Sequence, residues 1–387
     1  MKNLLLIFVT FLLFSCSDDT NSDISEDVTP DVETETTYQD FIALDFDNLI
    51  SYTPLDLPEH FDVALNLTNT PANNPITNEG AALGRVLFYD KSLSFNNTVS
   101  CASCHNQSRG FDDPNRFSTG FEGGETDAHA MRLLNAQYYL GENFFWDRRA
   151  ETLEAQTTQP IQNSVEMGFD VTHGGFEAVI TKLNSGEYYP ELFTIVYGDA
   201  VITEERIQFA LAQFIRAMVS SNSAFDDGFA QVYNSNAPDL GVTQDFPNYT
   251  EEENLGKRLF INSPPQGGVG CASCHQVPTF VLGPNSRSNG LDLGETTIFK
   301  SPSLKSASRS THFMHDGRFE SLAEVIEHYN SGIQMGPALD NRLITPNNTP
   351  IQLNLTDQEK NALAAFIETL VDTTIENDHR FSDPFIN

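Results

Sequence analysis

The chain is poor in the residues on which several protein classes depend. It has 21 basic residues against 54 acidic ones, a formal net charge of −33, and the phosphates of nucleic acid would repel such a protein. Five cysteines in 387 residues are too few for a disulfide-dense scaffold. The apolar fraction of 39%, with 29 phenylalanines, still supports folded cores and excludes global disorder. The length suits about two domains.

The chain also lacks a hydrophobic run long enough to span a membrane. Its one candidate, Leu4–Phe14, is shorter than the roughly 20 residues that a membrane helix needs and is typical of a secretory signal. Leu13-Phe14-Ser15-Cys16 resembles a bacterial lipobox, in which the cysteine is acylated. We expect residues 1–15 to be a lipoprotein signal peptide and the exported protein to be lipid-anchored, periplasmic or at the outer membrane or cell surface. A plain signal peptide with an incidental cysteine is the alternative.

The segment after the lipobox is rich in serine, threonine and acidic residues and has almost no large apolar side chain. Such a composition cannot bury a core. We therefore expect residues 16–38 to be a flexible acidic tether.

An internal repeat divides the rest of the chain. Four motifs occur twice, in the same order: Leu83–Phe88 with Leu255–Phe260, Cys101–His105 with Cys271–His275, Trp146–Leu153 with His315–Leu322, and Ala212–Ile215 with Ala364–Ile367. Four matched motifs indicate a duplicated domain. The polar stretch 234–248 separates the copies, so we expect domains at 39–240 and 241–387.

Each copy has the pattern of a mainly helical unit. Apolar residues recur at helical spacing in Glu204–Val219 and Asp357–Val371, and Thr356 with Glu359 forms a capping box. Long loops rich in glycine, asparagine and proline separate these segments, without the alternation that builds large sheets. The predicted fold class is mainly α, with two cytochrome c-like domains related by internal duplication.

The motif Cys-Ala-Ser-Cys-His occurs in both copies and predicts covalent haem. Two cysteines three positions apart each form a thioether to the porphyrin, and the following histidine binds the iron. The expected attachment residues are Cys101, Cys104 and His105 in the first copy, and Cys271, Cys274 and His275 in the second. Zinc, a thioredoxin-like pair or a disulfide within each motif are the alternatives. We expect two haem c groups.

From about residue 75 to 372 the chain resembles the bacterial dihaem cytochrome c peroxidase family, which includes the MauG-type enzymes. The motifs that carry this resemblance are Leu83–Asp90, Ser100–His105, Phe145–Ala150, Leu153–Gln156, Val165–Met167, Cys271–His275, Lys300–Leu304 and Met314–Gly317. The resemblance implies a peroxidase that reduces hydrogen peroxide to water with electrons from a small cytochrome c or a cupredoxin. It also implies pairing as a homodimer. A MauG-type oxidase of a protein or small organic substrate, or a plain electron-transfer cytochrome, are the alternative functions.

The resemblance also assigns roles to single residues. It implies that His105 is the proximal ligand of the peroxidatic haem and His275 that of the electron-transfer haem. Glu166 would be the distal acid and base that moves a proton between peroxide oxygens, and Gln156 a polar residue of the same pocket. Trp146 would lie between the haems as an electron relay. Each also has a simpler interpretation: a surface carboxylate, an exposed helix position and core filling, respectively.

Two positions depart from the family pattern. Phe121 stands where many members have a histidine that ligates the peroxidatic iron until reduction, so we predict an iron that is open without reductive activation. His129 is the nearby substitute, and we expect it to serve packing or the interdomain site. At the second haem the aligned sixth ligand is Tyr329, as in MauG-type proteins; Met314 and Met335 are the alternatives. A phenolate would lower the iron's reduction potential relative to a thioether.

The remaining expectations concern calcium and His315. The resemblance implies an interdomain calcium ion whose asparagine ligand is His129 here and whose carbonyl donors would fall near Ser310 and His312. Oxygen ligands suit calcium and an imidazole does not, which argues against this ion. His315 would contact a haem propionate or cap a loop. The acidic charge predicts a redox partner with a basic face and salt-sensitive association.

Overall fold

The structure is a computed structural model that describes residues 36–53, 55–65, 67–141 and 143–386. The predicted signal peptide, the lipobox cysteine and nearly all of the predicted tether lie outside the described residues. Thr37–Asn387 forms one compact unit. Within the described ranges, no helix is long and apolar enough to cross a membrane.

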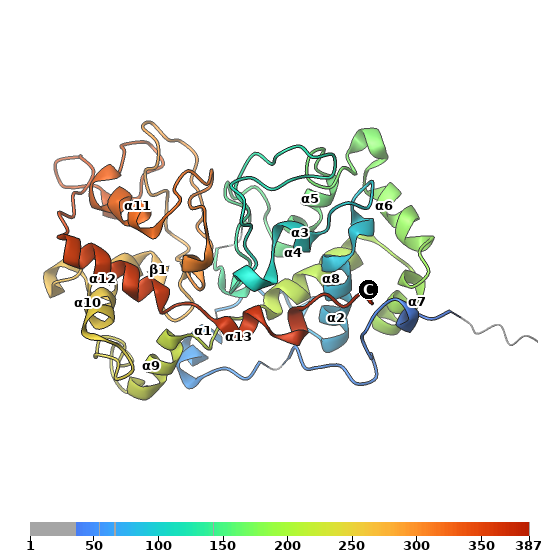
Figure 1. Cartoon of the computed structure of the whole chain (residues 1–387), viewed down its shortest axis with the longest axis horizontal. Helices are drawn as coiled ribbons and strands as arrows, with labels where there is room; N and C mark the ends of the chain where they lie inside the picture. The colour runs from blue at the N-terminus through green and yellow to red at the C-terminus, as the bar shows by residue number, and fades with distance from the viewer. Residues whose placement is uncertain (1–35, 54, 66, 142, 387) are drawn as a thin grey trace, which may run out of the picture. The chain divides into compact units, whose positions relative to one another are not determined.

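The described chain is mainly helical, as predicted (Figure 1). In the first half the helices are α1 Asp62–Leu65, α2 Asn78–Tyr89, α3 Cys101–Cys104, α4 Leu153–Thr157, α5 Gln159–Gln162, α6 Gly175–Asn184, α7 Tyr189–Tyr197 and α8 Glu204–Ala217. In the second half they are α9 Ala224–Val232, α10 Glu251–Ile261, α11 Leu322–Glu327, α12 Asp357–Glu368 and α13 Thr373–Glu376. The strands β1 His275–Gln276 and β2 Val281–Leu282 pair antiparallel, with His275 opposite Leu282.

The duplication appears as two matching helix pairs, α2 with α8 and α10 with α12 (Figure 1). A glycine marks the crossing in each. A Cβ atom on Gly84 would lie 2.0 Å from the carbonyl oxygen of Ala210, and one on Gly256 would lie 1.8 Å from that of Ala362. Only a residue without a side chain allows the two backbones to come this close. The repeated Leu-Gly motif is therefore the sequence signature of a repeated helix crossing.

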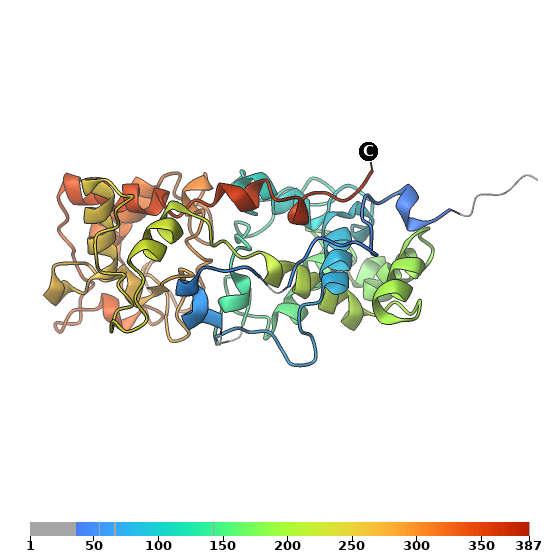
Figure 2. The same cartoon turned by 90° about the horizontal axis from the view of Figure 1, so that it is seen from below.

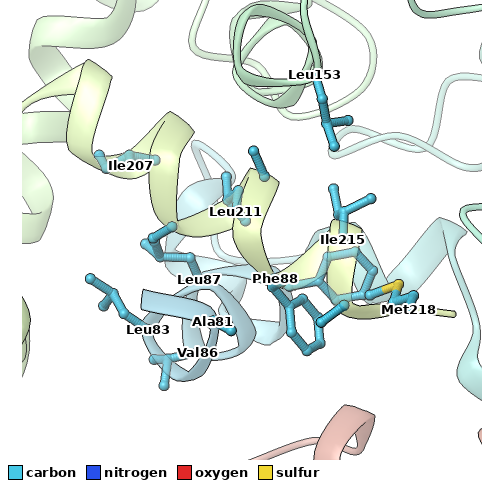
Figure 3. Packing of buried hydrophobic residues seen from close by; sticks show 14 of the residues in the cluster. Ala81, Leu83, Val86, Leu87, Phe88, Leu153, Ile207, Leu211, Ile215 and Met218 are labelled. Atoms are coloured by element: carbon cyan, nitrogen blue, oxygen red, sulfur yellow. The ribbon is translucent and has the colours of Figure 1, made fainter. Parts of the chain in front are cut away.

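Each helix pair carries its own core. In the N-terminal lobe, the α2 residues Leu83, Leu87 and Phe88 pack with Leu211 and Ile215 of α8, and all five are buried (Figure 3). Burial of such a side chain contributes about 1.5–3 kcal/mol. The C-terminal lobe is built in the same way, from buried apolar side chains of α10 and α12, including Leu259, Phe260, Leu363, Phe366 and Ile367.

The two lobes share one hydrogen-bonded frame because the C-terminal tail returns to the N-terminal lobe. Figure 1 shows the red segment after α13 running from the C-terminal lobe toward the N-terminal lobe, and Figure 2 shows the same segment from another side. Arg85 donates from Nε to the Ser382 carbonyl at 2.6 Å, and the Tyr52 hydroxyl donates to the Arg380 carbonyl at 2.8 Å. The end of the segment that we expected as the C-terminal domain, 241–387, thus completes the N-terminal lobe.

Candidate functional site

The first Cys-x-x-Cys-His motif borders a cavity of about 1700 Å³, partly open to solvent, in the N-terminal lobe. The motif forms helix α3, and the amide of Ser100 donates to the Ser103 hydroxyl at 3.0 Å at its start. The imidazole Nδ1 of His105 lies 3.2 Å from the Phe111 carbonyl oxygen. Burial lowers the pKa of His105, which favours the neutral ring. With Nδ1–H donating to Phe111, Nε2 is free to bind a metal.

The four cysteines of the two motifs fit thioether attachment better than the alternatives. None of them forms a disulfide. Burial raises the pKa of Cys101 to about 12 and that of Cys271 to about 12, so neither is the low-pKa thiolate that a redox-active Cys-x-x-Cys pair needs. In the part of the chain that the structure describes, no cluster of three or more His, Cys, Asp or Glu residues is placed to hold a metal ion.

The predicted distal residues line the same cavity as His105. Gln156 reaches it from α4, and Glu166 from the turn after α5. The Glu166 amide donates to the Asn163 side-chain oxygen at 3.1 Å, which anchors the turn. Burial raises the pKa of Glu166 above its ordinary value, although Arg149 at the cavity opposes this shift. Glu166 is therefore a carboxyl that holds a proton more readily than an exposed glutamate, as suits a group that must deliver one.

Phe121 does not border the cavity. Its ring is buried and packs edge-on against Phe95, with centroids 6.4 Å apart, and against Gly168. Its amide donates to the Glu166 carbonyl at 3.0 Å, so the residue supports the Glu166 turn. His129 borders the cavity, but both of its ring nitrogens face protein oxygens: Nδ1 lies 3.1 Å from the Arg116 carbonyl and Nε2 lies 3.4 Å from an Asp112 carboxylate oxygen.

The second motif borders a cavity of about 1760 Å³, also partly open to solvent, in the C-terminal lobe. Tyr329 borders it together with Cys271, Cys274 and His275, and it lies on a π-helical turn, His328–Gly332, a feature that is frequent at functional sites. Burial raises the pKa of the Tyr329 hydroxyl above its usual range.

The two methionine alternatives to Tyr329 differ in position. Met314 borders the C-terminal cavity, and its sulfur accepts a hydrogen bond from Asn289 at 3.3 Å. Met335 does not border the cavity; its carbonyl accepts from the Gly294 amide at 2.7 Å. Of the three predicted ligands, only Tyr329 and Met314 therefore share a cavity with His275.

A wall of side chains separates the two cavities. The residues that border both are His129, Ala130, Arg132, Trp146, Phe299, Lys300 and His315. The indole Nε1 of Trp146 donates to the His129 carbonyl at 2.6 Å, and the Trp146 carbonyl accepts from the Lys300 amide at 2.7 Å. Two hydrogen bonds thus hold Trp146 in the wall that separates the two cavities.

The residues at the expected calcium position make contacts with each other. Arg132 approaches the Asp112 carboxylate to 3.7 Å and donates to the Ser310 hydroxyl, which in turn donates to Asp112. The His312 ring contacts His129, with centroids 6.1 Å apart. A guanidinium group and two imidazole rings do not provide the oxygen ligands that calcium needs, and we assign no calcium to this position.

Sequence reasoning missed the contribution of cations to these cavities. Lys300 belongs to a motif that carries the resemblance, but its position in the wall depends on the fold. Arg287 borders the C-terminal cavity and stood out in no motif. Arg148 did leave a signal, because the repeat places Gly317 at the equivalent position.

The sequence and the fold are both similar to those of known dihaem proteins. The family model for di-haem cytochrome c peroxidases of the CCP and MauG type matches residues 78–233 and 250–382. The methylamine utilization protein MauG of Methylorubrum extorquens is 31% identical over 318 residues, covering 78% of this chain and 80% of that protein. The cytochrome c551 peroxidase of Nitrosomonas europaea is 30% identical over 273 residues, covering 66% and 74%.

Among solved structures, a MauG-like protein associated with microbial copper homeostasis is similar, with a TM-score of 0.67 and 26% identity over 86% of this chain and 99% of that one. The diheme peroxidase BthA of Burkholderia thailandensis shares the fold, with a TM-score of 0.60 and 20% identity over 80% and 88%. The matched regions contain both attachment motifs and both cavities. The chain therefore belongs to the dihaem cytochrome c peroxidase and MauG family, and it binds two haem c groups.

Proposed function

We propose that this protein is an exported, lipid-anchored peroxidase that reduces hydrogen peroxide to water in its N-terminal cavity. The observation that carries the proposal is that Glu166 and Gln156 line the same cavity as His105, whereas Phe121, at the position of a ligating histidine, packs outside it. The haem held by Cys101, Cys104 and His105 supplies an iron that binds peroxide and exchanges electrons with it.

The side chains of this cavity handle the protons. Glu166 takes the proton from the peroxide oxygen that binds first and delivers it to the oxygen that leaves as water. The Gln156 amide orients the peroxide, since it offers both a donor and an acceptor. Two electrons and two protons in total convert one hydrogen peroxide to two water molecules. The partial burial of Glu166, which raises its pKa, suits a group that must change its protonation state twice in each cycle.

The haem held by Cys271, Cys274 and His275 would supply the electrons, and the wall that contains Trp146 would be their path to this cavity. The donor in this proposal is a small cytochrome c or cupredoxin with a basic docking face, because the chain carries a net charge of −33. Long-range attraction of this kind speeds the encounter of the two proteins at low ionic strength. At physiological salt it is screened at distances beyond a Debye length of about 8 Å.

A MauG-type oxidase is the second candidate, and the position of Tyr329 favours it. This residue borders the C-terminal cavity together with Cys271 and Cys274. A phenolate ligand favours oxidised iron over reduced iron more strongly than a thioether does. In that case the electrons come from residues of another protein or from a small organic molecule.

Spectra of the oxidised holoprotein, followed by peroxide addition, test the proposal. We expect one high-spin iron before any reduction, and rapid peroxide-dependent oxidation of a reduced small cytochrome c or cupredoxin. A protein that consumes peroxide and accumulates oxidising equivalents without oxidising the donor supports the oxidase instead. A protein in which both irons are low-spin and unreactive contradicts both candidates.

A further inference from the structure

Three cations at or beside the C-terminal cavity have no carboxylate partner among the described residues. In the described part of the chain, no ion pair with an N–O distance of 4.0 Å or less includes Arg148, Arg287 or Lys300. Taking a charge out of water without a counter-ion costs free energy, so an anion from outside the described polypeptide is the natural partner.

Lys300 is the most buried of the three, with 4% of its surface exposed. Its ammonium group donates to the Asn143 carbonyl at 2.8 Å and lies over the rings of Tyr139 and Phe144, 4.1 and 4.6 Å from their centroids. Burial and, to a smaller extent, the positive charge of Arg148 together lower the pKa of Lys300 to about 7. These neighbours orient the charge at the cavity wall but do not neutralise it.

Arg287 borders the C-terminal cavity, and only carbonyl oxygens satisfy its guanidinium. It donates from Nη2 to the Pro337 carbonyl at 2.6 Å. The nearby carboxylate of Asp340 is engaged by the Arg342 side chain instead, at 2.7 Å. Arg287 thus lines the cavity that contains His275 and has no carboxylate partner among the described residues.

Arg148 combines an unpaired charge with an unfavourable backbone. Its Nε is buried without a hydrogen-bond partner. Burial lowers the pKa of Arg148, and the nearby positive charge of Arg287 lowers it as well. Its φ is +63°, and Gly317 at the equivalent position of the repeat has φ +62°. A left-handed backbone costs a residue with a side chain roughly 1–2 kcal/mol, so the arginine is retained here against a local cost.

We propose that Arg287 and Lys300, which line the C-terminal cavity, form an anion site together with Arg148 and that its ligand is a carboxylate, the propionate of the haem attached to Cys271 and Cys274. The charge of Arg148 lies close to those of both cavity residues. Charge-assisted hydrogen bonds to the carboxylate would satisfy the buried ammonium group of Lys300 and the half-buried guanidinium groups of Arg148 and Arg287. Their positive charge also favours the reduced, less positive iron and so raises its reduction potential. This inference rests on the bound haem and not on the peroxidase activity.

The test uses the holoprotein with Arg148→Gly and Arg287→Gln. Glycine fits the left-handed backbone at position 148, so the first variant removes the charge without adding strain. Arg258→Gln is the matched control, because Arg258 lies in the same half of the chain, exposed, and pairs with Asp245 at 2.5 Å. The two readouts are the midpoint potential of each haem by spectroelectrochemical titration and the propionate bending bands in resonance Raman spectra.

We expect Arg148→Gly and Arg287→Gln to lower the midpoint potential of the C-terminal haem and to shift its propionate bands, while Arg258→Gln changes neither. Unchanged potentials and bands in both variants overturn the site. A free anion is the other source of the same chemistry, and titration of the wild-type protein with formate tests it. A saturable formate effect that Arg148→Gly abolishes, with unchanged propionate bands, overturns the propionate assignment. None of these readouts depends on peroxide turnover.

Discussion

The ring of His315 lies flat against the ring of Phe299, with centroids 3.7 Å apart and planes 9° from parallel. Both residues border both cavities, as does Trp146, and the His315 carbonyl accepts from the His129 amide at 2.9 Å. The wall between the cavities is therefore built from closely packed aromatic rings, and His315 serves as part of this wall.

Replacing Trp146 by phenylalanine should slow electron transfer between the two haems, because the indole and its hydrogen bond to the His129 carbonyl at 2.6 Å are lost. We expect roughly a tenfold decrease, equivalent to about 1.4 kcal/mol in the barrier, in stopped-flow single turnovers that start from the reduced protein. Tyr197→Phe, a partly buried position on α7, is the control. Equal rates in wild type and W146F would show that Trp146 only fills space.

Replacing Glu166 by glutamine should lower peroxide turnover by about 10²–10⁴-fold, the usual contribution of a positioned acid and base. Glu122→Gln is the matched control, since Glu122 is exposed and only one residue beyond Phe121. The measurement is kcat/KM for peroxide with a reduced cytochrome. Similar losses in both variants would contradict the catalytic role.

The pH dependence of the same reaction should follow Glu166. Burial raises its pKa above the ordinary 4.5, and the carboxylate must be ionised to accept the first proton. We therefore expect kcat/KM to fall as pH decreases through a value above 4.5, and this acid limb to be absent from the residual activity of Glu166→Gln. An unchanged limb in the variant would assign the titration to another group.

The buried ion pair of Asp226 and Lys305, 2.5 Å apart, should dominate acid stability. Burial by itself raises the pKa of Asp226, but Lys305 and His60 outweigh it, so its pKa lies below the ordinary 3.8. Because the folded-state pKa is depressed, this stabilisation is complete above pH 3.8 and is lost as pH falls through the folded-state value.

Asp226→Asn leaves Lys305 buried without its carboxylate and should cost about 3–5 kcal/mol in the free energy of unfolding by denaturant. Asp245→Asn, in the exposed pair with Arg258, should cost at most about 1 kcal/mol. If the two variants are equally stable at pH 7, the buried pair contributes no more to the free energy of unfolding than the exposed pair does.

The helix crossings should tolerate no side chain at their glycines. Gly84→Ala and Gly256→Ala place a Cβ atom 2.0 and 1.8 Å from a backbone carbonyl oxygen, and overpacking of this kind costs about 1–3 kcal/mol. Gly124→Ala, whose Cβ would meet the Val165 side chain at 3.5 Å, is the control. Thermal unfolding followed at the haem absorption measures the loss, and equal midpoints for all three variants would contradict the repeated crossing.

The predicted lipid anchor requires Cys16. In the full-length chain, Cys16→Ala should prevent incorporation of labelled fatty acid and release the protein from the membrane fraction, while Ser17→Ala should change neither. Labelling that persists in the cysteine variant would refute the lipobox.

The sequence by itself determined the haem chemistry and the duplication. Covalent attachment depends on Cys101, Cys104 and His105 being neighbours along the chain, and a local motif can be recognised without knowing the fold. The repeat of Gly84 in Gly256 likewise predicted two copies of one unit, because a close helix crossing demands the same small residue wherever it occurs.

Only the tertiary structure decided which side chains meet. Phe121 and Glu166 are joined by a backbone hydrogen bond of 3.0 Å, Lys300 reaches the wall beside Trp146, and the tail returns to Arg85. These pairs are far apart in the sequence, and no local pattern encodes them. They come together because the two helix crossings orient the long loops. The position of each loop therefore depends on how the helices pack and not on the loop's own sequence.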